Sequence, residues 1–137
     1  MSLSLQQQLL EFVKKDQVKK FLDRLRKLDV TFTFDREDES RNRDTMTKLG
    51  LMETKEVYDI IRILEYTDYS SGPEENTSPY APKFFKDGEV WKFGKVVKGL
   101  VELEVYIKVC FKEHKGKGYT ACISFHEPHS KINYPLK

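Results

Sequence analysis

Two segments of strictly alternating side chains constrain this fold more than any other feature. From Val101 to Phe111 every second residue is apolar, and residues 119–126 repeat the pattern. The residues between the apolar positions of the first segment are Glu102, Glu104, Tyr106, Lys108 and Cys110. A period of two puts each set on its own face of a strand, so a half-buried sheet is predicted. The polar face is the candidate functional surface.

A turn rich in lysine and glycine separates the two segments. Residues 114–118 read His-Lys-Gly-Lys-Gly, and glycine tolerates the positive φ that tight turns need. We therefore expect an antiparallel hairpin in which Tyr106 lies near Ser124. The same register puts His126 opposite Glu104 and diagonal to Tyr106, whereas a slip of one residue would reverse the faces.

Length and composition indicate one domain. With 137 residues, 39% of them hydrophobic, the chain can bury a core, and a single domain over residues 1–137 is predicted. No apolar run approaches the length of a membrane span, and residues 5–10 lack the continuous hydrophobic core of a signal peptide. We expect a cytoplasmic protein with no membrane partner.

The cysteines and histidines do not suggest a metal site. Cys110 and Cys122 are predicted on the same face of neighbouring strands, with Lys108 near Cys122, and without a secretory signal both are expected as free thiols. There is no CxxC, no HExxH and no clustered His/Cys spacing. No metal and no other cofactor is therefore expected.

Charge is divided unevenly along the chain. Residues 1–82 carry 13 Lys and Arg against 16 Asp and Glu, whereas residues 83–137 carry 11 Lys against 6 Asp and Glu. The half that holds the alternating segments is thus basic. This asymmetry favours a polyanionic partner, above all nucleic acid, although a solvated lysine-rich surface explains the charge equally well.

The other elements are expected mainly before the alternating segments. They are a helix over about residues 4–28, a strand over 30–34, helices over 41–49 and 54–64, a loop over 67–82 and a strand over 89–97. Gly50 suits a helix end, and Gly94 indicates a bulge or a close backbone approach. The order predicts an α+β fold with helices packed on one face of a small antiparallel sheet, the polar face open and an N-terminal helical extension over about residues 1–28.

Several short blocks, in order, resemble one family. The blocks are Gln17-Val18-Lys19-Lys20, Leu49-Gly50-Leu51, Asp68-Tyr69-Ser70-Ser71-Gly72-Pro73, Trp91-Lys92-Phe93-Gly94-Lys95, Val105-Tyr106-Ile107-Lys108 and Cys122-Ile123-Ser124-Phe125-His126. Together they resemble the MqsR-like toxins of type II toxin–antitoxin systems, in the RelE/ParE-like superfamily. The resemblance covers about residues 17–135 and implies a RelE-like fold.

The same resemblance implies an activity. Such toxins are mRNA interferases: endoribonucleases that cut mRNA without a metal, arrest translation and are neutralised by a cognate antitoxin protein. His126 and Lys92 match family positions after the Ser-Phe and Trp of the motifs, where a polar residue is common. The chain departs from the family at Ser70 and Ser71, because members often carry a lysine just after the Asp-aromatic-Tyr element.

Metal-free RNA cleavage needs few functional groups. A protein must remove the proton of the ribose 2′-hydroxyl, neutralise charge on the phosphate and protonate the leaving 5′-oxygen. The candidate catalytic residues are His126, Tyr106, Lys92 and Lys108, and the candidate RNA-binding residues are Lys95, Ser124 and Tyr69. Lys92 shares their face only if the turn at residues 98–99 has a three-residue loop or if Gly94 is a bulge.

Two other classes of function stay open. The chain could be a non-catalytic RNA binder, or a protein whose sheet edge is completed by another chain. In those cases His126 is a solvated strand-end residue, Tyr106 covers Lys108, and Lys92 and Lys95 protect an edge strand. His114 and His129 fall in a turn and a tail, where a surface role is the ordinary one.

Overall fold

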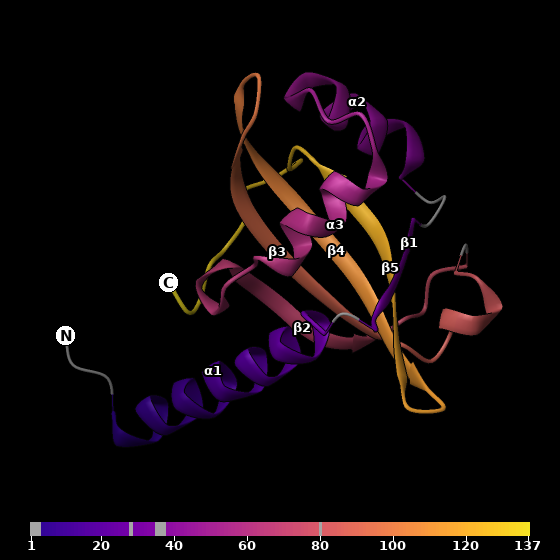
Figure 1. Cartoon of the computed structure of the whole chain (residues 1–137). Helices are drawn as coiled ribbons and strands as arrows, with labels where there is room; N and C mark the ends of the chain where they lie inside the picture. The colour runs from indigo at the N-terminus through magenta and orange to yellow at the C-terminus, as the bar shows by residue number, and fades with distance from the viewer. Residues whose placement is uncertain (1–3, 28, 35–37, 80) are drawn as a thin grey trace.

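The computed structural model describes residues 4–27, 29–34, 38–79 and 81–137 (Figure 1). The elements are α1 (Leu5–Leu25), β1 (Thr31–Phe34), α2 (Glu39–Leu49), α3 (Thr54–Arg62), η1 (Tyr66–Asp68), β2 (Tyr69–Glu75), η2 (Lys83–Phe85), β3 (Glu89–Lys98), β4 (Glu102–His114) and β5 (Lys117–His126). The strands form one sheet in the order β1-β5-β4-β3-β2. The predicted α+β class is confirmed.

The sheet differs from the expected one at its two edges. Strands β3 to β5 form the predicted antiparallel meander and β2 extends it, but β1 pairs with β5 in parallel, with Thr31 beside Tyr119. The sheet is therefore mixed. At the other edge, β2 lies within the segment predicted as a loop. Its pairing with β3 shifts register twice, so no regular alternation marks it in the sequence.

Helix boundaries follow local capping. Ser4 caps α1, which runs without a break to Leu25; the predicted extension over about residues 1–28 is this helix, and residues 1–3 and 28 lie outside the described part. Gly50 ends α2 with φ 79°, the left-handed conformation expected there. Glu53 is the N-cap of α3. In the described chain, no helix combines the length and apolar character that a membrane span requires.

One face of the sheet carries the main core, and we call it the helix face. Its strand residues include Val105, Ile107, Val109 and Phe125, all buried. All three helices contribute to the same core, through the list Val18, Phe21, Leu22 and Leu25 of α1, Leu49 of α2, and Val57 and Ile61 of α3. Burial of these side chains away from water is the main force that holds the helices to the sheet.

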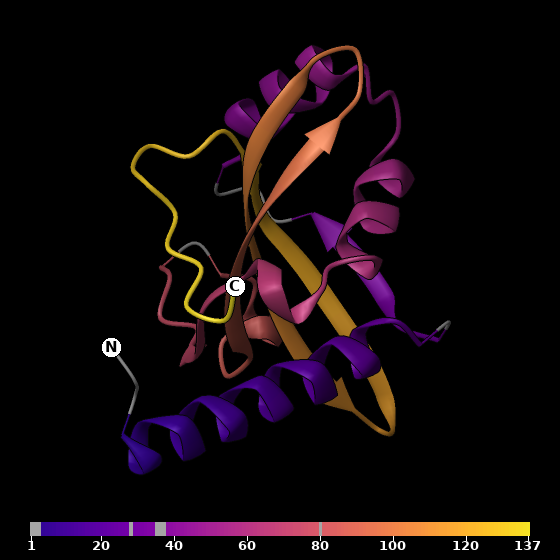
Figure 2. The ribbon, with the colours of Figure 1, turned by 90° about the vertical axis from the view of Figure 1, so that its left-hand side faces the viewer.

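The opposite face, with Tyr106 and Lys108, is called here the tail face, because the C-terminal segment (residues 127–137) crosses it. Figure 2 shows this segment on the other side of the sheet from α3. A Cβ on Gly94 would stand 2.4 Å from the Tyr134 hydroxyl, so Gly94 permits a close approach, as one reading of its position predicted. The Tyr134 hydroxyl donates to Glu104 at 2.7 Å. The tail face is thus partly covered rather than fully open.

A two-residue turn, at which His114 pairs with Lys117, and a bulge in β5 together change the expected pairing. Lys108 pairs with Ser124 but Val109 pairs with Cys122, so Ile123 is the extra residue. Tyr106 consequently faces His126, and the predicted pairs of Tyr106 with Ser124, of Lys108 with Cys122 and of His126 with Glu104 are wrong. The cysteines also separate: Cys122 joins the main core, whereas Cys110 packs in a small second core with Phe85, Ala121 and Ile123.

The side chain of Asn42 completes β5 where β1 ends. Among the residues that the structure describes, β1 pairs with β5 as far as Cys122, and the next backbone groups of β5 are met by α2 instead. The buried Asn42 amide donates to the carbonyl oxygen of Ile123 at 3.1 Å and accepts from the N–H of Phe125 at 2.8 Å. One residue of α2 therefore acts as a continuation of the sheet at the bulge.

Replacing Asn42 should therefore destabilise the fold. Asn42→Ala leaves two buried backbone groups unpaired, and we expect a loss of about 2–4 kcal/mol in the free energy of unfolding. Urea unfolding measures this loss. Thr47→Ala, an exposed change on the same helix, is the control and should stay within about 0.5 kcal/mol. Equal effects of the two changes would contradict the role given to Asn42.

Candidate functional site

Polar side chains from three neighbouring strands meet on the tail face. The register pairs Tyr106 with His126, Lys108 with Ser124, and Lys92 with Lys108. Lys98 pairs with Glu102, so the loop between β3 and β4 has three residues, which is one of the conditions under which Lys92 was predicted to join this face. Paired residues lie about 5 Å apart at Cβ. The structure thus brings the four candidate catalytic residues and Ser124 together.

His126 is buried and hydrogen-bonded through both ring nitrogens. Only 4% of its surface is exposed. Nδ1 lies 2.9 Å from the carbonyl oxygen of Glu127, and Nε2 lies 3.3 Å from Oδ2 of Asp38. Both partners are acceptors, so a ring with a proton on each nitrogen satisfies both. These contacts fix the orientation of the ring.

Asp38, at the start of α2, links two strand residues. Its Oδ2 accepts a hydrogen bond from the Ser124 hydroxyl at 2.6 Å and also faces His126 Nε2. Burial acts to raise the pKa of Asp38, but the hydrogen bonds from Ser124 and His126 outweigh it and hold that pKa below its ordinary value. The carboxylate therefore remains charged and ties α2 to the end of β5.

A cleft lies between the sheet and the C-terminal segment, and we call it the tail cleft. Its lining residues are Ser70, Tyr106, Pro128, His129, Ser130, Lys131, Ile132 and Asn133. The ring centroid of His126 lies 5.6 Å from that of Tyr106 and 5.3 Å from that of His129. His129 is exposed, and its Nε2 lies 2.6 Å from Nη1 of Arg41. Because arginine only donates, this nitrogen of His129 accepts.

The two lysines of this face differ in their balance of charge. Lys92 Nζ lies 2.8 Å from Glu74 Oε1, and the hydrogen bond to Glu74 raises the pKa of Lys92, so its positive charge is fixed but compensated. Lys108 has no ion pair with any described residue. Lys108 is therefore the cation of the cluster best able to attract a phosphate.

Two of the predicted RNA-binding residues lie on the opposite face. Lys95 pairs with Val105 of the main core, and its Nζ lies 3.6 Å from Asp68 Oδ2. Tyr69 is 5% exposed and packs in the main core, where its hydroxyl donates to the carbonyl oxygen of Gly72 at 2.6 Å. Neither residue belongs to the tail-face cluster.

The structure adds three residues that sequence reasoning missed. Asp38 and Arg41 come from α2, more than 80 positions away in the chain from their partners His126 and His129. No local pattern signals a contact at such separation. His129 was set aside as a tail residue, although its place three residues after His126 offered a weak signal. Within the described ranges, no group of His, Cys, Asp and Glu could hold a metal ion.

The lowered pKa of Asp38 predicts how stability depends on pH. Its stabilising effect is complete above the unfolded-state value, near 3.8, and is lost as pH falls through the lower folded-state pKa. Asp38→Asn should therefore be less stable than the wild type at pH 6, and the gap should narrow toward pH 2 (about one to two units below a typical Asp pKa).

Urea unfolding across this pH range is the measurement. Asp59→Asn, an exposed change on α3, is the control and should stay within about 0.5 kcal/mol of the wild type throughout. A constant gap between Asp38→Asn and the wild type at all pH values would show that the ionised carboxylate is not the cause.

The chain was also compared with known proteins. No protein-family model matches it, and neither a curated protein nor a solved structure does. What the site does is therefore inferred from its own side chains, together with the resemblance of the ordered sequence blocks to MqsR-like toxins.

Proposed function

We propose that this protein is a metal-independent endoribonuclease that cleaves mRNA. The observation that carries the proposal is the meeting of Tyr106, His126 and His129 beside Lys108 on one face of the sheet. An exposed imidazole, a phenol and an ammonium group that has no ion pair with a described residue are groups that can carry out cleavage through the ribose 2′-hydroxyl, and the second imidazole, that of His126, packs against the first. The basic charge of residues 83–137 supports a polyanionic substrate.

The accessible groups divide the chemistry between them. His129 lines the tail cleft, and imidazole is the side-chain group best suited to proton exchange near neutral pH, so we assign to His129 the exchange of a proton with the ribose or the leaving oxygen once its Nε2 leaves Arg41. Tyr106 lines the same cleft from the sheet and orients the ribose or donates a proton. Lys108 neutralises charge that develops on the phosphate.

His126 acts by positioning rather than by contact with RNA. Its burial and its two hydrogen bonds keep the ring from the substrate while it packs against both Tyr106 and His129. This role differs from the one expected from the sequence, in which His126 itself transfers the proton. Lys92 lies opposite Lys108 on the neighbouring strand, and its ion pair with Glu74 compensates its positive charge.

The biological setting that we propose is that of a toxin. The ordered motif blocks, which resemble those of MqsR-like toxins, support it. In this setting the protein acts on mRNA in the cytoplasm, arrests translation when free, and is neutralised by a cognate antitoxin protein.

A non-catalytic RNA binder is the second candidate, and one observation favours it. The histidine at the centre of the cluster is held by Asp38 and by the backbone of Glu127, an arrangement that also suits a purely structural role. In that case Tyr106 and His129 would stack on bases and Lys108 would neutralise phosphates, without cleavage.

Cleavage of a long RNA in EDTA distinguishes the two candidates. Wild-type protein should cut the RNA, and His129→Ala should lose about 100-fold in rate, the scale of a positioned proton-transfer group, with little change in RNA affinity. Tyr106→Phe separates the effect of the hydroxyl from that of the ring. Mapped RNA ends and single-turnover rates provide the measurement.

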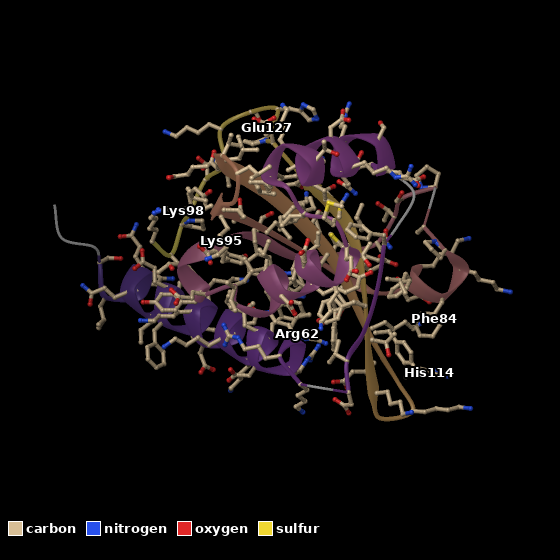
Figure 3. The ribbon with its side chains drawn as sticks, turned by 45° about the horizontal axis from the view of Figure 1, so that its top comes forward. Arg62, Phe84, Lys95, Lys98, His114 and Glu127 are labelled. Carbon is tan, nitrogen blue, oxygen red and sulfur yellow. The ribbon has the colours of Figure 1, made fainter. Side chains whose placement is uncertain are left out.

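The control for this experiment is His114→Ala. His114 lies at the end of the β4–β5 hairpin, at the opposite end of the sheet from Glu127 (Figure 3). It removes an exposed imidazole without touching the cleft and should keep full activity. If wild-type protein binds RNA but leaves it intact, the binder is the correct function; if His129→Ala cuts at the wild-type rate, the proton-transfer role of His129 is wrong.

Expression in bacteria tests the proposed toxin. Wild-type protein should slow growth, His129→Ala should not, and co-expression of the product of an adjacent gene should restore growth. That product should also raise the melting temperature of the purified protein, because a partner that binds only the folded state stabilises it. Normal growth at high soluble expression of the wild type would contradict the toxin.

A further inference from the structure

A row of lysines lies on α1, beside the sheet edge formed by β2. The Nζ atoms of Lys15 and Lys19 stand 4.5 and 4.9 Å from the centroid of the same ring, that of Tyr66 in η1. Lys14 Nζ lies 3.4 Å from the carbonyl oxygen of Gly72 in β2. We call Lys14, Lys15 and Lys19 the basic strip.

The lysines of the basic strip make no ion pairs with described residues, and three of the nearby carboxylates pair with other cations. The surrounding ion pairs are Lys20 with Asp16 at 3.0 Å, Arg26 with Asp23 at 3.5 Å, and Lys95 with Asp68 at 3.6 Å. None of the three lysines of the strip has an ion pair with a described residue, and Glu11, one turn earlier on α1, makes none with them. The strip is therefore a local excess of positive charge.

The spacing of the lysines in the basic strip does not stabilise α1. Lys15 and Lys19 are four residues apart, and like charges at this spacing destabilise a helix. Cation–π attraction to Tyr66 holds both ammonium groups in place and offsets part of the repulsion. An anion between the two ammonium groups would remove the remaining repulsion, so the strip is preorganised to bind an anion.

The strip and the tail cleft are close along the chain. The ring of Tyr66 contacts Lys15 and Lys19 of the strip, and Ser70, four residues later, lines the cleft. Four residues span at most about 14 Å. In Figure 2 the N-terminal half of α1 lies below the C-terminal segment, whereas its other end lies below α3. The basic strip and the tail cleft therefore lie on the two sides of the sheet edge at β2, and one single-stranded polymer can contact both.

We propose that the basic strip binds the phosphates of the RNA strand whose scissile bond lies in the tail cleft. The strand leaves the cleft past Ser70, crosses β2 and lies along α1, where Lys14, Lys15 and Lys19 contact its backbone. This inference rests on the proposed function, since it takes RNA as the substrate of the cleft. Contacts to phosphate alone make this part of recognition independent of sequence.

The test compares RNAs of two lengths that cannot be cut. A trinucleotide fills the cleft alone, whereas a strand of about 16 nucleotides can also reach α1. Both carry methylated 2′-hydroxyls, which removes the nucleophile. Affinity is measured over a series of salt concentrations for wild type, Lys14→Gln/Lys15→Gln/Lys19→Gln and Lys15→Gln/Lys19→Gln. The matched control, Lys55→Gln/Lys86→Gln/Lys117→Gln, removes three exposed charges away from α1.

The triple strip variant should lower the slope of log affinity against log salt for the long RNA by about 2, because each phosphate contact to a single strand contributes about 0.7. The double variant, which keeps the bond from Lys14 to Gly72, should lose about two-thirds of that amount. Trinucleotide affinity should not change. Equal slopes for strip and control variants, or equal losses for both RNA lengths, would overturn the inference.

The outcomes separate this inference from the proposed function. Suppose that unmodified RNA is cut in EDTA but the salt dependence of affinity for the long RNA is the same in strip and control variants. The basic strip is then not part of the RNA site, and the proposed nuclease function remains supported. If the slope falls as expected but wild-type protein cuts nothing, the strip binds RNA and the nuclease is wrong. Absence of RNA binding by the wild type overturns both.

Discussion

The tail face depends on the pair of hydrogen bonds between the Asn42 amide and the β5 backbone at Ile123 and Phe125. These bonds satisfy the strand where β1 stops, and so they allow β5 to carry a bulge without leaving buried polar groups unpaired. The bulge turns His126 toward Tyr106. The helix that supplies Asn42 also supplies Asp38, whose carboxylate holds His126 and Ser124. One anchoring contact thus sets the geometry of the cluster and brings its acidic partner to it.

How much of this arrangement the sequence predicts depends on how local each feature is. Alternation over residues 101–111 predicts β4 correctly, and Gly50 predicts the end of α2, because both follow from the conformation of a few adjacent residues. The bulge at Ile123 cannot be predicted from adjacent residues. Asn42, which stabilises the extra residue, lies about 80 positions away, and the alternation of apolar and polar residues continues through the bulge without a break. The two-residue turn, at which His114 pairs with Lys117, reverses the predicted face of Cys122, and the bulge returns Ser124 and His126 to the expected side.

The candidate site shows the same contrast between residue type and environment. Tyr106, Lys108 and His126 could be grouped from strand periodicity, but their division of roles follows from burial, which periodicity does not give. Contacts from α2 and from Glu127 enclose His126, and the histidine that lines the cleft is His129 instead. Tyr69 and Lys95 carry side chains suited to RNA, yet their pairing with Phe93 and Val105 places them on the helix face. There they adjoin η1 and the lysines of α1 rather than the cleft.

The position of β5 between β1 and β4 has a consequence for synthesis. As the chain emerges from the ribosome, β2, β3 and β4 can pair in sequence, but β1, although made earlier, has no neighbour until β5 appears. The tail cleft needs residues 128–133 as well, which are translated after every strand. A nascent chain therefore has an incomplete cleft until the ribosome has read the codons for both β5 and residues 128–133.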